Sequence, residues 1–206
     1  LIFTGSILSQ HNSGKFGITV FGGVAFPYGD FGSTYSDKAG YAKTGFSALA
    51  QGSLKLNENV NWVSTVSLAV NSLNDFELIS VIPGVNEVVA SNYITNWIMT
   101  GFGFQSSPSS RITVYGLGQL GLLISLQPDL EFKLQNGDVI NQSTKTAIAF
   151  GHSFGFGIKI NKVDLSLRYF GGEPVYEQTA KIDDISNSVK VKLPASLFKL
   201  LIGFNI

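Results

Sequence analysis

The sequence has 206 residues, with 14 basic and 14 acidic side chains, no cysteine and 23 glycines, and its length suits one domain. Charged residues make up 14% of the chain and hydrophobic residues 44%, a composition that excludes intrinsic disorder. The balanced charge argues against a nucleic-acid partner, because such proteins carry a basic excess. Without cysteine, disulfides, thiolate catalysis and cysteine-ligated metals are excluded.

The low charge suits a membrane protein, yet the sequence has no uncharged apolar stretch long enough for a spanning helix. The other structure that satisfies every backbone polar group inside a bilayer is a closed β-barrel. The composition therefore favours a barrel.

Residues 1–10 are an apolar stretch followed by small and polar residues. This pattern is typical of the end of a secretory signal peptide, with cleavage near Ser9 or Gln10. The alternative is a short, frayed N-terminal strand. We expect residues 1–10 to be a signal-peptide remnant and residues 11–206 to form a single domain.

Eight segments alternate with the period of a β-strand. They span about residues 15–26, 43–56, 60–71, 92–104, 111–125, 146–160, 163–170 and 195–206. The connections alternate between short (57–59, 105–110, 161–162) and long (27–42, 72–91, 126–145, 171–194). Outer-membrane barrels combine short periplasmic turns with long extracellular loops. We therefore predict an all-β fold: an eight-stranded antiparallel up-and-down transmembrane β-barrel whose long loops face the cell exterior.

Pairing the segments around their short turns separates two faces, since directly opposite residues share a face. The predicted pairs on the apolar face are Leu54–Trp62, Ala50–Val66, Phe46–Val70, Ile158–Leu165, Phe156–Leu167 and Phe154–Tyr169. The pairs on the other face are Lys55–Asn61, Gln51–Thr65, Lys159–Asp164 and Gly155–Arg168. We expect the apolar face to meet lipid and the other to fill a narrow lumen. The inverse arrangement would be that of a soluble, lipocalin-like carrier.

Three sets of residues become candidate sites on this barrel. We expect a structural ion pair in the lumen among Lys159, Asp164 and Arg168, because buried charges persist mainly when paired. The candidates for the aromatic girdles, or for the wall near them, are Trp62, Tyr93, Trp97 and Tyr169. The third set is unusually apolar for a loop and would either extend a hairpin above the membrane or contact a partner protein: Leu78, Ile79, Val81, Ile82 and Val85.

The net charge of zero is unevenly distributed. The four long connections hold twelve acidic and six basic side chains, and the strands and short turns hold the opposite imbalance. Acidic loops are most simply solvated loops above an anionic lipid surface. Divalent-cation binding is the alternative, but no D-x-D-x-D-G loop occurs, so we predict no metal site and no cofactor.

Catalytic constellations are weak in this sequence. His152 and Ser153 are adjacent, so on a strand they point to opposite faces and cannot act as a base and nucleophile pair. The G-x-G-x-x-G match at 116–121 lies within an alternating strand with no helix after it, so it predicts no nucleotide site. Its glycines are better explained as space for the lumen and points of strand curvature. We predict no enzymatic activity; a lipid-modifying enzyme of the lipid A acyltransferase or deacylase kind is the alternative.

Several segments, in this order and spacing, resemble a known family. They are Gly14-Lys15-Phe16-Gly17, Ala39-Gly40-Tyr41-Ala42, residues 96–104, residues 154–160, Leu167-Arg168-Tyr169-Phe170 and residues 201–206. The chain resembles porin-like outer-membrane β-barrel proteins, distantly of the OmpA/OmpX type, from Bacteroidota-like Gram-negative bacteria. The resemblance implies signal-directed export and insertion into the outer membrane, and it implies no particular activity. The expected role is structural, adhesive or within a partner complex, and the expected partners are outer-membrane lipids and another outer-membrane or surface protein.

Overall fold

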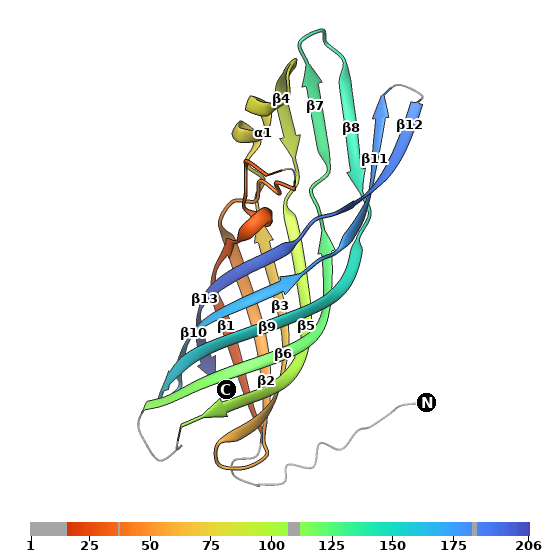
Figure 1. Ribbon diagram of the computed structural model, residues 1–206. Coiled ribbons are helices and arrows are strands. Elements are labelled where there is room, and N and C mark those ends of the chain that lie inside the picture. The colour runs from red at the N-terminus through yellow and green to blue at the C-terminus, as the bar shows by residue number, and fades with distance from the viewer. Residues whose placement is uncertain (1–15, 37, 107–111, 183–184) are drawn as a thin grey trace, which may run out of the picture.

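The computed structural model describes residues 16–36, 38–106, 112–182 and 185–206. These residues form a closed barrel with a second sheet above it (Figure 1). The predicted signal-peptide remnant, residues 1–10, and part of the predicted 105–110 turn lie outside the described residues. Within the described residues, no helix has the length and apolar character needed to cross a membrane.

Eight antiparallel strands close the barrel, which confirms the predicted fold. In chain order they are β1 (Phe16–Pro27), β2 (Gly45–Lys55), β3 (Val60–Asn71), β5 (Tyr93–Gln105), β6 (Ile112–Leu126), β9 (Ala147–Ile160), β10 (Val163–Gly172) and β13 (Ala195–Asn205). Each strand pairs with its neighbour along the chain, and β1 pairs with β13 to complete the circle. This closure leaves the barrel without a free edge, so every strand has a partner on both sides.

The predicted register is confirmed in both hairpins for which it was derived. Leu54 lies opposite Trp62, and Phe46 lies opposite Val70, on β2 and β3. On β9 and β10, Lys159 lies opposite Asp164. A shift by one residue would have turned every apolar side chain to the other face, so the separation of faces in the sequence fixes this pairing.

The wall of the barrel is apolar outside and mixed inside. On β13 the outward side chains of Leu200, Ile202 and Phe204 are exposed, whereas Lys199 and Leu201 are buried in the lumen. Small residues make room for large ones there: a Cβ on Gly155 would lie 2.8 Å from Cγ of Arg168. The apolar face therefore points outward, as predicted for a barrel surrounded by lipid.

Three of the four segments expected to be long loops contain strands, so that expectation was wrong in detail. A five-stranded upper sheet is built from β4 (Val85–Ala90), β7 (Leu130–Leu134), β8 (Val139–Thr144), β11 (Val175–Ile182) and β12 (Ile185–Lys192), in the order β12-β11-β8-β7-β4. Its strands are short, with five to eight residues each, and some of them, such as β8, do not alternate between apolar and polar residues. The hairpins become stable because they continue paired strands of the barrel, which is a tertiary effect.

Each strand of the upper sheet continues a barrel strand after a break of two or three residues (Figure 1). Pro128, Pro174 and Pro194 occupy three of these breaks, where the lack of an N–H interrupts the hydrogen-bond ladder. Hydrogen bonds join neighbouring strands at the level of these breaks: Ser91 N donates to Asp129 O at 3.1 Å, and Lys145 N donates to Glu177 O at 3.1 Å. The upper sheet is therefore attached to the barrel through all five of its strands.

The upper sheet has no strand above β1, β2 and β3. There the mouth of the barrel is covered by the 3-10 helix η1 (Gly29–Phe31), the segment after it, and the helix α1 (Asp75–Val81). Phe31 packs edge-on against Tyr93, with ring centroids 5.1 Å apart. A hydrophobic core at the mouth consists of Ala25, Phe31, Ala42, Ala69, Leu73, Val85, Val88, Tyr93 and Leu197.

Candidate functional site

The predicted lumen ion pair is a cluster arranged around a tyrosine. The Tyr115 hydroxyl donates to Oδ1 of Asp164 at 2.7 Å, and the Lys159 ammonium lies 5.1 Å from the centre of the Tyr115 ring. None of the ion pairs within the described residues joins Lys159, Asp164 and Arg168, so the prediction of a direct pair was wrong. Tyr115 instead contacts both groups, since its hydroxyl bonds Asp164 and its ring lies under Lys159.

Two cations lie side by side higher in the lumen. Arg168 on β10 is directly opposite Lys199 on β13, and both are fully buried. The Nε of Arg168 donates to Ser166 at 2.9 Å, and the Lys199 ammonium donates to Ser67 at 2.7 Å. Each cation also lies over an aromatic ring: Arg168 over Phe21 at 4.7 Å and Lys199 over Phe170 at 4.3 Å. These contacts stabilise the like charges in part.

The lumen is filled by side chains. Arg168, Lys199, Phe21 and Phe170 are among the largest fully buried side chains of the described chain, together with Trp97. A cavity between β2 and β6 beside Tyr115 and Lys159 measures about 10 Å³, roughly the space of one water molecule.

Two of the four aromatic residues predicted for the girdles remain candidates, and the other two do not lie on the outer wall. Trp62 and Tyr169 point outward, whereas Tyr93 and Trp97 are buried inside the barrel and its mouth. On β5 apolar side chains occur on both faces, so alternation alone did not separate them. Tyr93 and Trp97 share the inward phase of Met99. They therefore belong to the interior and not to a girdle.

An aromatic cluster gathers around Tyr169 on the outer wall. Its ring centroid lies 4.8 Å from that of Phe154 and 5.2 Å from that of Phe198. Tyr28 packs edge-on against Phe198 at 5.1 Å, and His152 lies 5.8 Å from Tyr169. This arrangement, with polar tips on apolar rings, is the kind found at a membrane–water interface. That this aromatic cluster lies at a membrane–water interface stays a prediction.

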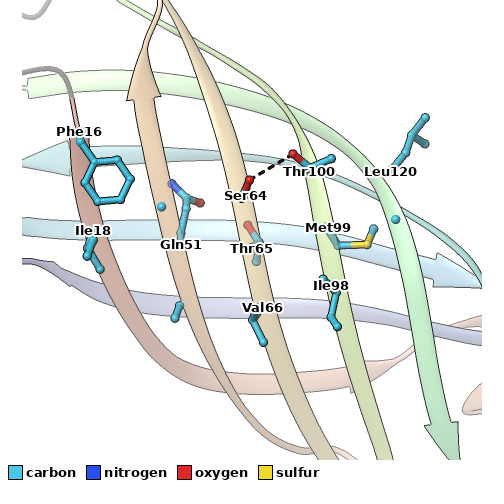
Figure 2. A pocket seen from close by; sticks show the side chains of 13 residues that line it. Phe16, Ile18, Gln51, Ser64, Thr65, Val66, Ile98, Met99, Thr100 and Leu120 are labelled. Atoms are coloured by element: carbon cyan, nitrogen blue, oxygen red, sulfur yellow. Dashed lines mark hydrogen bonds between the residues drawn. The ribbon is translucent and has the colours of Figure 1, made fainter. Parts of the chain in front are cut away.

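The outer wall also has a hollow of about 470 Å³ across β2, β3 and β5 (Figure 2). Gly52, Ser64 and Thr100 lie side by side in the register of these strands, and their small side chains form the floor. The hydroxyl oxygens of Ser64 and Thr100 are 3.2 Å apart and hydrogen-bond each other. Larger side chains border the hollow: Phe16, Ile18, Val66, Ile98 and Leu120. Because it faces outward among apolar side chains, an acyl chain fits its chemistry.

The apolar segment predicted either to extend a hairpin or to contact a partner mostly packs against the mouth core. Leu78, Ile79 and Ile82 are half-buried against this core, and Val85 belongs to it as the first residue of β4. Val81 is different, because 54% of its surface is exposed, and the neighbouring Phe76 is 77% exposed. One face of α1 therefore closes the mouth and the other is open to solvent, and the contact with a partner protein stays a prediction.

Four exposed ion pairs connect the described part of the upper region, and one of them, Lys133–Glu87, joins β7 to β4 at 3.1 Å. A hydrogen bond from Lys43 to Oδ1 of Asp75, 3.1 Å long, holds the pKa of that carboxyl below its usual value and ties α1 to the barrel rim. Lys145 likewise lowers the pKa of Glu177 through a 2.8 Å hydrogen bond. A hydrogen bond from Lys192 lowers the pKa of Glu173. The last two pairs lie at the line where the barrel strands break and the upper sheet begins.

The structure separates the two candidate catalytic residues on β9. His152 is exposed on the outer face and Ser153 is buried in the lumen, as predicted. Within the described part of the chain, no group of three or more histidine, aspartate or glutamate side chains could hold a metal ion. Gly116 and Gly118 of the G-x-G-x-x-G match face outward, so only Gly121 serves the lumen as expected.

Comparison with solved structures identifies bacterial outer-membrane barrels. The outer-membrane protein OprG from Pseudomonas aeruginosa matches with a TM-score of 0.52 at 10% identity, over 93% of this chain and 97% of that chain. Ail, the attachment invasion locus protein of Yersinia pestis, matches with 0.47 at 12% identity, over 94% and 99%. Neisserial surface protein A matches with 0.45 at 14% identity, over 93% and 96%. No protein-family model matches the sequence, and a search of curated proteins finds no match. The closed barrel and its likeness to OprG show that this chain has the fold of the small eight-stranded outer-membrane β-barrels.

Proposed function

We propose that the chain is a non-enzymatic outer-membrane protein that presents its upper sheet and α1 at the cell exterior to another outer-membrane or surface protein. The observation that carries the proposal is α1, whose inner face closes the barrel mouth while Phe76 and Val81 stand exposed on a structure attached to the barrel. Exposed apolar side chains of this kind favour a protein contact.

The packed lumen supports this role over conduction. Trp97, Arg168 and Phe170 are fully buried across the barrel interior, and eight strands leave a lumen that side chains fill. The proposal therefore expects no channel activity. Purified protein inserted in a planar bilayer should give no conductance steps; steps that depend on folded protein would contradict it.

The contact is tested with a double variant, Phe76→Ser with Val81→Ser, and the control double variant Val139→Ser with Val175→Ser. The control removes two exposed apolar side chains elsewhere in the upper sheet. Complexes are cross-linked in native outer membranes and purified in mild detergent. We expect the control and the unmodified chain to retain the same partner and the α1 variant to lose it. Retention by the α1 variant, or a bare monomer in every sample, would overturn the proposal.

The orientation is tested separately, since the chain has no cysteine. Lys190→Cys places a single thiol on the exposed β12, and Glu58→Cys places one in the turn between β2 and β3. On intact cells, a membrane-impermeant maleimide should label the first variant and not the second. The reverse pattern would place the upper sheet in the periplasm and exclude surface display.

A further inference from the structure

A cavity of about 240 Å³ lies at the barrel mouth, between α1 and the upper sheet. Leu78 and Ile82 line it from the side of α1, and Leu130 and Phe132 line it from β7. The remaining lining residues are Ala39, Tyr41, Leu73, Tyr93, Gln127, Pro128, Gln142, Gln178 and Leu193. None of these thirteen side chains carries a formal charge, so the cavity is apolar with a few neutral polar groups.

Three glutamine amides supply most of the polar character of this cavity. Gln178 Nε2 donates to Oε1 of Gln127 at 2.9 Å, and Gln142 lies on β8 opposite Leu130. A primary amide has two hydrogens and an oxygen with two lone pairs. The single bond between Gln127 and Gln178 therefore leaves both amides able to bind a further donor or acceptor. These groups converge on one wall, while α1 supplies an apolar wall.

The cavity borders the hydrophobic core at the barrel mouth, since Leu73 and Tyr93 belong to both. Below it, the Tyr176 hydroxyl donates to Oγ of Ser125 at 2.6 Å, and both groups are buried. Tyr93, which lines the cavity, donates to the carbonyl oxygen of Gly40 at 2.5 Å. These bonds and the mouth core close the floor. A molecule in the cavity would be held at the mouth and not passed into the lumen.

We propose that this cavity binds a small, uncharged and largely apolar molecule that carries one hydrogen-bonding group. Its volume exceeds the roughly 150 Å³ of an apolar cavity that holds benzene and is below the ~300 Å³ of the smallest usual ligand pockets. A charged ligand is disfavoured, because none of the lining side chains could compensate its desolvation. The inference goes beyond the proposed surface contact and does not depend on it, since Phe76 and Val81 are not among the lining residues.

The test uses 2-naphthol as the probe, naphthalene as its apolar analogue and 2-naphthoate as its charged analogue. In this cysteine-free chain, Leu78→Cys places a thiol in the cavity, and Val81→Cys places one on the exposed face of the same helix. Both variants are placed in lipid nanodiscs and reacted with a charged maleimide. At ten times its dissociation constant, 2-naphthol should slow the reaction of the first thiol about tenfold and leave the second unchanged. 2-Naphthoate should have no effect on either.

Several outcomes would overturn the proposal. One is equal slowing at both thiols, which would mean that the probe acts through the bilayer; others are no slowing at the Leu78 position, or equal protection by 2-naphthoate. Adding Gln142→Leu to the Leu78→Cys variant should weaken protection by 2-naphthol and leave that by naphthalene unchanged. Equal loss for both probes would contradict the role given to the amide.

A measurement on the unmodified chain keeps the test independent of whether the cysteine variants fold. Methyl NMR spectra in nanodiscs should show shifts for Leu78, Ile82 and Leu130 when 2-naphthol is added. The methyl groups of Leu200 and Ile202, which face outward on the barrel, serve as the control for probe dissolved in lipid. Shifts confined to the outward methyl groups would overturn the proposal.

Discussion

Arg168 on β10 lies directly opposite Lys199 on β13, and both side chains are fully buried in the barrel. Like charges directly opposite each other on a sheet destabilise it, and their burial adds a desolvation cost. Lys199 donates to Ser67 and lies over Phe170, so it is held by a hydroxyl and a ring. The fold tolerates this pair because the rest of the barrel is closed and packed.

Lys199→Met is expected to leave the barrel as stable as before or stabilise it by about 1–3 kcal/mol, since a buried cation next to another is replaced by an apolar chain. The measurement is the free energy of unfolding in urea with the protein in detergent micelles. Ser67→Ala, which removes only the hydroxyl bonded to Lys199, should be destabilising in the same assay. A loss of more than about 2 kcal/mol in Lys199→Met would show that the cation is a net stabiliser.

Asp164→Asn is expected to destabilise the barrel, because it removes the negative charge from a buried cluster that also holds Lys159 and Arg168. Asp164 is the one buried carboxylate among the described residues, and Tyr115 donates to it. Tyr115→Phe should cost less, about 1–3 kcal/mol, since it removes a hydrogen bond and leaves the charge in place. The same urea titration compares the two variants; an equal cost for both would contradict this order.

Gly121→Ala on β6 should impair folding, whereas Gly118→Ala on the same strand should be tolerated. A Cβ on Gly121 would collide with the carbonyl oxygen of Ile98, while a Cβ on Gly118 meets no atom within 4 Å. The expected cost at Gly121 is about 1–3 kcal/mol or more, as for overpacking of a core. Gel mobility before and after heating measures the folded fraction. Equal folded fractions for both variants would show that β5 and β6 can move apart near Gly121 to accommodate the added Cβ.

Lipids brominated on their acyl chains should quench the fluorescence of Trp62 and spare Trp97. Trp62 is 40% exposed on the outer wall, and Trp97 is fully enclosed. Trp97→Phe should therefore keep most of the quenching, and Trp62→Phe should lose it. Strong quenching in Trp62→Phe would place Trp97 against lipid, as expected for a residue of an aromatic girdle.

As the pH is lowered, the upper sheet and α1 are expected to lose stability at a higher pH than the barrel does. Asp75, Glu173 and Glu177 each have a pKa lowered by a hydrogen bond from a lysine. A lowered carboxyl pKa stabilises the fold above the pKa of the unfolded chain, about 4, and this contribution disappears as the pH falls through the folded-state value. The protection factors for amide hydrogen exchange in α1 and β11, which are corrected for the pH dependence of intrinsic exchange, should be constant from neutral pH to about 5 and fall below about 4. An Asp75→Asn variant should abolish the change in α1 alone.

The barrel could be predicted from the sequence because lipid outside and side chains inside impose a strict alternation. The pairing of Phe154 with Tyr169 and of Lys159 with Asp164 follows from that alternation and a two-residue turn. The inward direction of Trp97 could not be predicted, since β5 carries apolar side chains on both faces. The upper sheet was missed because its strands are short: β7 alternates over only five residues, and β8 does not alternate between apolar and polar residues. The mouth cavity depends on Gln127, Gln142 and Gln178, which are distant in sequence and have no motif in common.

The joint between the upper sheet and the barrel has a mechanical consequence. Five strands extend from the barrel rim into the upper sheet. At its break, each strand is joined to a neighbouring strand by a backbone hydrogen bond or an ion pair. A force applied at the end of β11 or β7 is therefore distributed over strands that continue into the barrel wall. The upper sheet cannot rotate relative to the barrel as a domain on a flexible linker would. A partner protein bound to α1, or a small molecule bound beneath it, is therefore held at a fixed height and angle above the bilayer. This favours binding to a partner in a single orientation.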